Sequence, residues 1–507
     1  MKWLWIAVFA GAPLGAQDLN PLPLAVLRDK ISGGWAGQMI GVSYGAPTEF
    51  KYQARINEDP LPGWKPERVS NALNQDDLYV DMTFAKVLDE KGLNATTKDF
   101  GAMFRESKYR LWHANLGARR ALKRGVPPTK SGMPKYNVHA NDIDFQIEAD
   151  FIGLMAPGLY QSARDLAWRA GRIMNYGDGI YGGMFVSAMY AAAFFESDPR
   201  KVVEAGVSIL PPRSPYARLI GDVLVWSRQY PNDWKKVWQL IEDKWDKREA
   251  CPAGALTPFN IDAKINGAYV ALGLLYGHRD FGTTLEISTR AGQDSDCNPS
   301  TAGGILGVML GYSGIPEMWK GGIPAIADKK FSYTDFTFKT ICESTEKRAV
   351  ALVRKTGGRL DGDTLWIKVQ KPSPAKLEIW DDFGSPVERV PVSDPRWKFQ
   401  GDWKLSGKTK TANTKGAEAV FEFTGSGVIL TGPYLPGGGK ADVYLDGKRV
   451  KTVDVYPDED RAKSGEAVYH VFRLKDRRHA VRLVVRGEPF PGSTGSDIGL
   501  TDAVVFR

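Results

Sequence analysis

The stretch GQDSDCNPSTAGGILGVMLG, from Gly292 to Gly311, places two carboxylates in a turn directly ahead of a helix. Asn298 suits the N-cap position, and Pro299 suits the first helical position because its missing N–H would be unpaired there in any case. The positive end of the helix dipole would support the negative charges of Asp294 and Asp296. We therefore predict a buried helix that delivers an Asp-x-Asp pair to a site.

Glycines recur every four residues along this helix, and a similar row lies near the start of the chain. The two rows are Gly303, Gly307 and Gly311, and Gly33, Gly37, Gly41 and Gly45. Each glycine costs roughly 1 kcal/mol of helix propensity relative to alanine. The first row therefore indicates a helix face that packs closely against a neighbour. The apolar run of the helix in the stretch from Gly292 to Gly311 is shorter than the roughly 20 residues that a membrane span needs.

Three carboxylate groups stand at the ends of predicted elements. Glu49 follows the early glycine row, the Asp294/Asp296 pair precedes the late one, and Asp76 and Asp77 open a helix with apolar residues at helical spacing. Those apolar positions are Leu78, Met82, Ala85 and Leu88. Hard oxygen ligands of this kind suit Mg²⁺ or Ca²⁺.

With these motifs in this order, residues 24–320 resemble the ADP-ribosylglycohydrolase family, an all-helical fold with a metal site between its helices. The family pattern is a glycine-rich first helix that ends in Glu, a Thr-Asp-Asp, and a Gly-Asp-x-Asp-Thr before a helix of small residues. Here Gln75 and Cys297 stand where the two Thr ligands belong. The resemblance implies one or two Mg²⁺ or Ca²⁺ ions, held by residues from Glu49, Gln75, Asp76, Asp77, Asp294, Asp296 and Cys297.

The stretch HANDIDFQIEADFIGLMAPG, residues 139–158, carries further carboxylates into a predicted helix. Asp144 and Glu148 are four residues apart and would share one helix face. Because glycoside cleavage uses a proton donor and a base or nucleophile, Glu148 is the first candidate for the acid. Asp77, Glu49 and Asp150 are the other candidate catalytic residues. Alternatively, these acids cap the helix or pair with arginines.

Several polar and aromatic residues are candidates for binding a sugar. They lie in the acidic stretch, in the segment 109–119, at the start of a small-residue helix and beside a later apolar helix. Each has a structural alternative, such as helix capping or surface packing. The candidates are Asp142, Asp144, Asp178, Trp112, His113 and Asn266.

The chain divides into three expected regions. Residues 1–16 contain a lysine, a short apolar run and a small-residue cleavage site, which is typical of a secretory signal peptide and predicts a periplasmic or secreted protein. Residues 17–348 have helical periodicity. Residues 349–507 show alternating strand patterns, and Asp446-Gly447 is a strong hairpin signal. We predict a helical domain followed by an all-β jelly-roll or sandwich domain that resembles carbohydrate-binding modules.

Composition excludes several function classes. The five histidines have no zinc-ligand spacing, which disfavours a zinc hydrolase, and no Gly-x-Ser-x-Gly elbow is present. No nucleic-acid motif occurs, the N-terminal apolar run is too short to span a membrane, and no other segment is long and apolar enough to do so. The net charge of +8 comes from scattered lysines and arginines. A bridge between Cys251 and Cys342 is one use of the three cysteines in an oxidising compartment.

The sequence therefore predicts a secreted, metal-dependent glycoside hydrolase that cleaves a bond, furanosidic by resemblance, in an extracellular glycan or glycoside. One alternative is a true hydrolase of ADP-ribosyl or nucleoside N-glycosidic bonds. Another is a non-catalytic glycan-binding protein.

Overall fold

Helices α1 (Leu24–Gly45) and α14 (Cys297–Leu310) pack against each other along their glycine rows. An ideal Cβ on Gly33 would lie 2.2 Å from the carbonyl oxygen of Gly307, and one on Gly41 would lie 2.0 Å from that of Pro299. No side chain fits at these positions, so the backbones themselves are in contact. The predicted close packing of the glycine-marked helix is confirmed.

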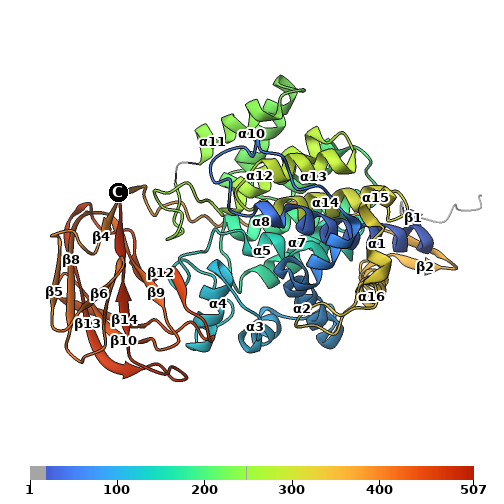
Figure 1. Cartoon of the computed structure of the whole chain (residues 1–507). Helices are drawn as coiled ribbons and strands as arrows, with labels where there is room; N and C mark the ends of the chain where they lie inside the picture. The colour runs from blue at the N-terminus through green and yellow to red at the C-terminus, as the bar shows by residue number, and fades with distance from the viewer. Residues whose placement is uncertain (1–18, 247) are drawn as a thin grey trace, which may run out of the picture.

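The computed structural model describes residues 19–246 and 248–507, and Figure 1 shows a helical domain beside a β-rich domain. The predicted signal peptide lies outside the described residues. None of the described helices combines the length and apolar character needed to cross a membrane. The expected multidomain fold, helical and then all-β, is confirmed.

The remaining helices of the helical domain surround the α1–α14 pair. They are α2 (Asp76–Lys91), α3 (Thr97–Glu106), α4 (His113–Lys123), α5 (Asp144–Ile147), α6 (Asp150–Leu154), α7 (Tyr160–Gly171), α8 (Asp178–Ala193), α9 (Pro199–Ser208), α10 (Pro215–Gln229), α11 (Trp234–Trp245), α12 (Ala263–Tyr276), α13 (Phe281–Arg290), α15 (Glu317–Lys320) and α16 (Phe338–Lys355), with 3-10 helices η1 (Ala46–Thr48), η2 (Pro66–Asn74) and η3 (Ile323–Ala325). The apolar positions predicted for α2, Leu78, Met82, Ala85 and Leu88, are all buried.

A small antiparallel sheet ties the chain after α16 back to the helical domain. It has the order β1 (Asn20–Pro23), β3 (Thr364–Ile367), β2 (Arg359–Asp361), with Asn20 paired to Ile367. The boundary expected at residue 348 therefore falls inside α16, and the helical domain includes this first hairpin.

Two antiparallel sheets form the body of the C-terminal domain. One has the order β11-β10-β13-β8-β5, the other has the order β12-β9-β15-β4, and a smaller sheet has the order β14-β7-β6. The strands are β4 (Pro386–Pro391), β5 (Trp397–Gln400), β6 (Lys404–Ser406), β7 (Thr409–Ala412), β8 (Glu418–Gly425), β9 (Gly427–Tyr434), β10 (Gly439–Leu445), β11 (Lys448–Asp454), β12 (Lys463–Val471), β13 (Arg477–Pro489), β14 (Ile498–Leu500) and β15 (Asp502–Phe506).

The hairpin predicted at Asp446-Gly447 joins β10 to β11. Both residues have positive φ, 48° and 81°, as the tight turn that suits the strand twist requires. The alternating pattern of residues 377–380 is typical of a strand and predicts one, but this prediction is wrong, because the segment forms no strand and has no strand partner among the described residues. Trp380 is buried there against Phe383 and Phe472 instead of in a ladder.

Two other segments differ from what their sequence patterns indicate. The polar segment from Tyr52 to Asn74 has no clear periodicity and predicts a loop, yet Pro66–Asn74 form η2. The acidic stretch 139–158 is not one helix but two short ones, α5 and α6, with Glu148 between them. Asp144 and Glu148 consequently do not share a continuous helix face.

Salt bridges and cation–π contacts join the two domains. Arg120 and Arg124 of α4 both reach Asp454 of β11, at 3.1 and 2.6 Å, and the Arg120 guanidinium lies 3.6 Å from the centre of the Tyr434 ring. Arg119 pairs with Glu459 at 2.9 Å. These charges are largely buried, so removing one partner of a pair would leave the other charge uncompensated. The ion pairs therefore hold α4 against the β domain.

Candidate active site

The α1–α14 contact brings the first and last acidic segments together. The Oγ1 atom of Thr48 lies 2.9 Å from Oγ of Ser295, and the backbone N–H of Phe50 donates to the carbonyl oxygen of Gln293 at 3.2 Å. Gly292 and Gln293 both have positive φ, 84° and 55°, which turns the chain sharply ahead of the acidic pair. The turn that carries Glu49 is thus bonded directly to the Asp294–Asp296 turn.

Two groups of potential metal ligands result, and they share Asp296. In the first group, oxygens of Glu49, Asp294 and Asp296 lie within 4.8 Å of one another. In the second group, Asp77 and Asp296 lie within the same distance of the Cys297 thiol. The Cys297 thiol donates to Oδ2 of Asp77 at 3.4 Å. The first group offers only oxygen, whereas the second adds sulfur.

The electrostatics of this cluster fit a bound cation. Asp77, Asp294 and Asp296 are buried, and one carboxylate oxygen of each has no hydrogen-bond partner among the described residues. Loss of hydration where its carboxylate faces the cluster, followed by repulsion from Asp296 and Asp76, raises the pKa of Glu49 to about 8, although the residue keeps an exposed side. Burial raises the pKa of Asp296 to about 6. A cation at the centre would satisfy the free oxygens and remove the repulsion, as hard oxygen sites for Mg²⁺ and Ca²⁺ do.

The other two expected metal ligands stand outside these groups. Gln75 is the N-cap residue of α2, but its side chain makes no capping bond. Asp76 belongs to neither group, although its charge raises the pKa values of Glu49 and Asp296. The structure therefore brings five of the seven expected ligands together: Glu49, Asp77, Asp294, Asp296 and Cys297.

The predicted N-cap of α14 is wrong. The helix begins at Cys297 with Asp296 at the cap position, two residues earlier than expected. Asn298 instead donates through Nδ2 to Oδ1 of Asn266 at 3.0 Å. The same Asn266 oxygen accepts from the backbone N–H of Asp294 at 3.4 Å, so Asn266 supports the acidic turn from α12.

Glu148 is a buried carboxyl held by Asn115 of α4, which donates to Oε1 through its Nδ2 atom. Its Oε2 atom has no partner among the described residues. Burial raises the pKa of Glu148 well above its usual value, and repulsion from Asp144 and Asp76 raises it further. This shift favours the protonated form of Glu148, and the charge of Asp76, which also raises the pKa values of Glu49 and Asp296, contributes to it.

Asp150 lies deeper than the other candidates. It is completely buried at the start of α6, and its charge raises the pKa of Asp81, whose Oδ2 atom accepts from the backbone N–H of Phe151 at 3.1 Å. Burial raises the pKa of Asp150 to about 7. The structure gives Asp150 core neighbours, Asp81 and Tyr190, that sequence reasoning did not connect with it.

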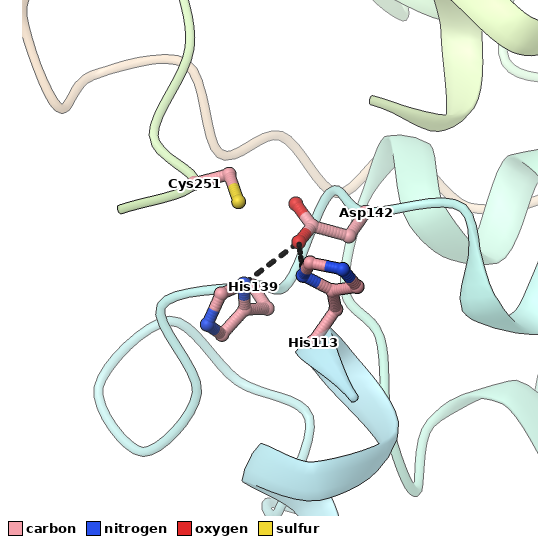
Figure 2. Close-up of side chains that lie close together, drawn as sticks. All are labelled: His113, His139, Asp142 and Cys251. Carbon is pink, nitrogen blue, oxygen red and sulfur yellow. Dashed lines mark hydrogen bonds and ion pairs between the residues drawn. The ribbon is translucent and has the colours of Figure 1, made fainter. Parts of the chain in front are cut away.

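Asp144 caps a neighbouring helix. Its two oxygens accept from the backbone N–H groups of Ala114 and Asn115 at 3.2 and 2.8 Å, at the start of α4. Oδ2 of Asp142 lies 2.7 Å from Nδ1 of His139, within hydrogen-bond distance. Asp142 and His113 thus belong to a separate cluster (Figure 2), in which His139 faces Glu466 of the β domain.

The last two binding candidates contact protein groups. Trp112 is half-exposed, and the ammonium group of Lys463 from β12 lies 4.0 Å from its ring centre. Asp178 opens α8 and accepts from the backbone N–H of Tyr216 at 3.2 Å. Neither belongs to the two metal-ligand groups.

Sequence reasoning overlooked Thr48 and Ser295, whose hydroxyl contact joins the two acidic turns, because serine and threonine carry no signal without their partners. It also treated Cys251 only as a candidate for a disulfide. The structure keeps Cys251, Cys297 and Cys342 as free thiols, so the considered Cys251–Cys342 bridge is absent from the described residues.

Comparison with known protein families gives a match that covers the helical domain. The ADP-ribosylglycohydrolase family model matches residues 23–349. Among solved structures, an ADP-ribosylglycohydrolase-related protein complex is similar over 64% of this chain and 99% of that chain, at 14% identity and a TM-score of 0.43. The CBM36-1 domain of a multidomain xylanase from the hindgut metagenome of Trinervitermes trinervoides is similar over 23% of this chain and 94% of that domain, at 10% identity and a TM-score of 0.18. The comparison with curated proteins finds no match.

Proposed function

Since the chain belongs to the ADP-ribosylglycohydrolase family, we propose that it is a secreted, metal-dependent glycosidase that cleaves a furanosidic bond of an extracellular glycan or glycoside. Family membership supports a glycosyl hydrolase-like activity. Beyond this activity, we propose the substrate class, the metal dependence and the export.

The observation that carries the proposal is the all-oxygen group of Glu49, Asp294 and Asp296. Glu49 is exposed while the two aspartates are buried, so the group has one side toward solvent. A bound Mg²⁺ or Ca²⁺ would supply a positive charge that binds sugar hydroxyls and makes a water more acidic. The second group is less suited to these ions because sulfur is a soft ligand.

Glu148 supplies the proton that the leaving oxygen needs. A general acid must be protonated at the working pH, and burial shifts the pKa of Glu148 in the direction that favours this form. Asn115 fixes Oε1, which leaves Oε2 as the oxygen that delivers the proton. Asp77, next to the shared ligand Asp296, is placed to bind the cation or to orient the attacking water.

Export is supported by the leader-like residues 1–16 and by the attached β domain. A secreted enzyme meets glycans rather than the ADP-ribosylated proteins of the cell interior. Within the same family, hydrolysis of an ADP-ribosyl or nucleoside N-glycosidic bond is the second candidate activity, and the family match favours it.

A substrate panel distinguishes these activities. Purified protein is incubated with aryl furanosides, aryl pyranosides, plant and bacterial glycans, and ADP-ribosyl-arginine, and released product is quantified. The proposal predicts release from a furanoside or glycan that Asp294→Asn abolishes. Release confined to ADP-ribosyl-arginine would replace the proposed substrate. Binding of a sugar without any release would favour the non-catalytic glycan-binding protein.

A further inference from the structure

Four side chains with nitrogen, oxygen and sulfur donors converge outside the acidic site. They come from three separate segments: the first residue of α4, the turn before α5, and the loop after α11. One donor atom from each lies within 4.8 Å of the other three. Figure 2 shows the thiol and both imidazole rings turned toward the carboxylate. The four residues, here called the His–Cys cluster, are His113, His139, Asp142 and Cys251.

Hydrogen bonds and ion pairs already order this cluster. Nδ1 of His139 lies 2.7 Å from Oδ2 of Asp142, and Nδ1 of His113 lies 3.9 Å from the same oxygen. His139, Asp142 and Cys251 are buried, whereas the His113 side chain keeps 24% of its surface exposed. The donor atoms thus face one point from different sides, with one ligand next to solvent.

The surroundings orient each donor. The His113 ring stacks on Phe259, with centroids 5.8 Å apart. The second nitrogen of His139, Nε2, lies 3.7 Å from a carboxylate oxygen of Glu466 on β12, and the backbone N–H of Cys251 donates to Glu249 at 2.8 Å. The Glu466 oxygen is beyond hydrogen-bond distance of Nε2, and a shift of a few tenths of an ångström would give the histidine–carboxylate contact that orients imidazole toward a metal.

We propose that the His–Cys cluster binds one divalent transition-metal ion of the zinc class, with Cys251, His113, His139 and Asp142 as its four ligands. Thiolate, imidazole and carboxylate are the ligands that Zn²⁺ takes in four-coordinate sites. The sulfur and two nitrogens disfavour Mg²⁺ and Ca²⁺, which prefer oxygen alone. The chain therefore has two chemically different cation sites, one hard and one soft.

The site lies where the two domains meet. His139 and Glu466 both line an interdomain cavity of about 230 Å³, which gives an ion a route to the ligands. Binding would displace the proton of the Cys251 thiol and require a neutral Nδ1 on both histidines. All four ligands come from the helical domain, while the β domain contributes Glu466 behind His139.

Cobalt(II) provides a direct probe, because a bound Co²⁺–thiolate pair gives a sulfur-to-cobalt charge-transfer band. Full-length protein is reduced, stripped with chelator and titrated with Co²⁺ in the presence of excess Mg²⁺. The proposal predicts a saturable charge-transfer band at one ion per chain, which Zn²⁺ abolishes by displacement. Cys251→Ser is expected to remove the band.

Two matched thiol variants make the assignment specific. Cys297→Ser changes the thiol of the acidic site, and Cys342→Ser changes a thiol near neither cluster. Both are expected to keep the band. A band lost in Cys297→Ser but kept in Cys251→Ser would overturn the proposal, and so would reduced wild-type protein without any band.

His113→Gln guards against a folding artefact in Cys251→Ser. Because His113 is partly exposed, its replacement is compatible with the fold, which circular dichroism and metal-free thermal unfolding verify. The proposal predicts an unchanged metal-free unfolding midpoint and a Co²⁺ affinity at least tenfold weaker. Wild-type affinity in this variant would contradict His113 as a ligand and the four-coordinate site.

Discussion

An ideal Cβ atom on Gly37 would lie 2.1 Å from the carbonyl oxygen of Gly303, so α1 and α14 touch through their backbones at this point. This contact sets the distance between the Glu49 turn and the Asp294–Asp296 turn. The geometry of the candidate metal site therefore depends on residues that contribute no ligand.

Replacing Gly37 with alanine is expected to destabilise the protein by about 3 kcal/mol or more, because the new methyl group has no space. Urea unfolding measures this change. Gly221→Ala in α10 is the matched control, because no heavy atom lies within 4 Å of its Cβ position. That variant should gain up to about 1 kcal/mol from helix propensity. Equal stability of the two variants would refute the backbone contact.

Cys297→Ser is expected to strengthen Mg²⁺ binding. The thiol lies beside Asp77 and Asp296, where a hydroxyl oxygen is a better ligand for a hard cation. We predict roughly tenfold tighter binding, equivalent to about 1.4 kcal/mol, by isothermal titration calorimetry. Cys342→Ser should leave the affinity unchanged. Weaker Mg²⁺ binding by Cys297→Ser would contradict this account, because it would show that the thiol serves the cation better than a hydroxyl oxygen at this position.

Glu148→Gln is expected to lower kcat by about 10²–10⁴-fold while cation binding stays the same. Glutamine keeps the shape of the side chain but has no acidic proton. Because the wild-type pKa is raised, wild-type activity should fall as pH increases through that value, and the variant should lose this limb of the pH profile. Glu90→Gln, at an exposed position of α2, is the control. Near-normal turnover in Glu148→Gln would exclude it as the acid.

Asp178 predicts a specific pH dependence of stability. Burial raises its pKa from 3.8 to about 7, and Asp262 adds to this effect while Lys264 opposes it. Between these pH values the folded state holds a proton that the unfolded state has lost, so the free energy of unfolding falls as pH rises. The full contribution is at most roughly 4 kcal/mol.

Asp178→Asn removes this titration and keeps an oxygen for the backbone N–H of Tyr216. The variant should therefore gain stability relative to wild type as pH rises from about 4 to about 7.5. Urea unfolding of both proteins at the two pH values gives the difference. A difference that does not change with pH would show that Asp178 titrates normally in the folded state.

The sequence predicted the fold where patterns were local and repeated. The glycine row from Gly303 to Gly311 required a close neighbour, and Asp446-Gly447 required a tight hairpin. The spacing of Asp144 and Glu148 placed them on one face if the segment formed a helix, but the structure has two short helices, α5 and α6, with Glu148 between them. Asp144 caps α4 and Asn115 donates to Glu148, and these contacts with a distant helix could not be read from the spacing.

The candidate sites were predictable to different degrees. The acidic ligands lie in compact motifs, so their identities were visible, whereas the separation into an oxygen group and a thiol-containing group needed coordinates. The His–Cys cluster has no spacing that could reveal it. Its two histidines lie on different elements, and Cys251 joins them only because the loop after α11 folds back onto the turn before α5.

The most direct test of the central claim is sugar release after removal and return of the cation. The best substrate from the panel is incubated with wild-type protein, with chelated protein, and with chelated protein that has received Mg²⁺ or Ca²⁺. Asp294→Asn is assayed beside them, with the surface variant Asp328→Asn as control. The account predicts release by wild type and control, loss on chelation, recovery with the added ion, and no release by Asp294→Asn. Release that persists at the wild-type rate in chelator and in Asp294→Asn would contradict a metal-dependent glycosidase.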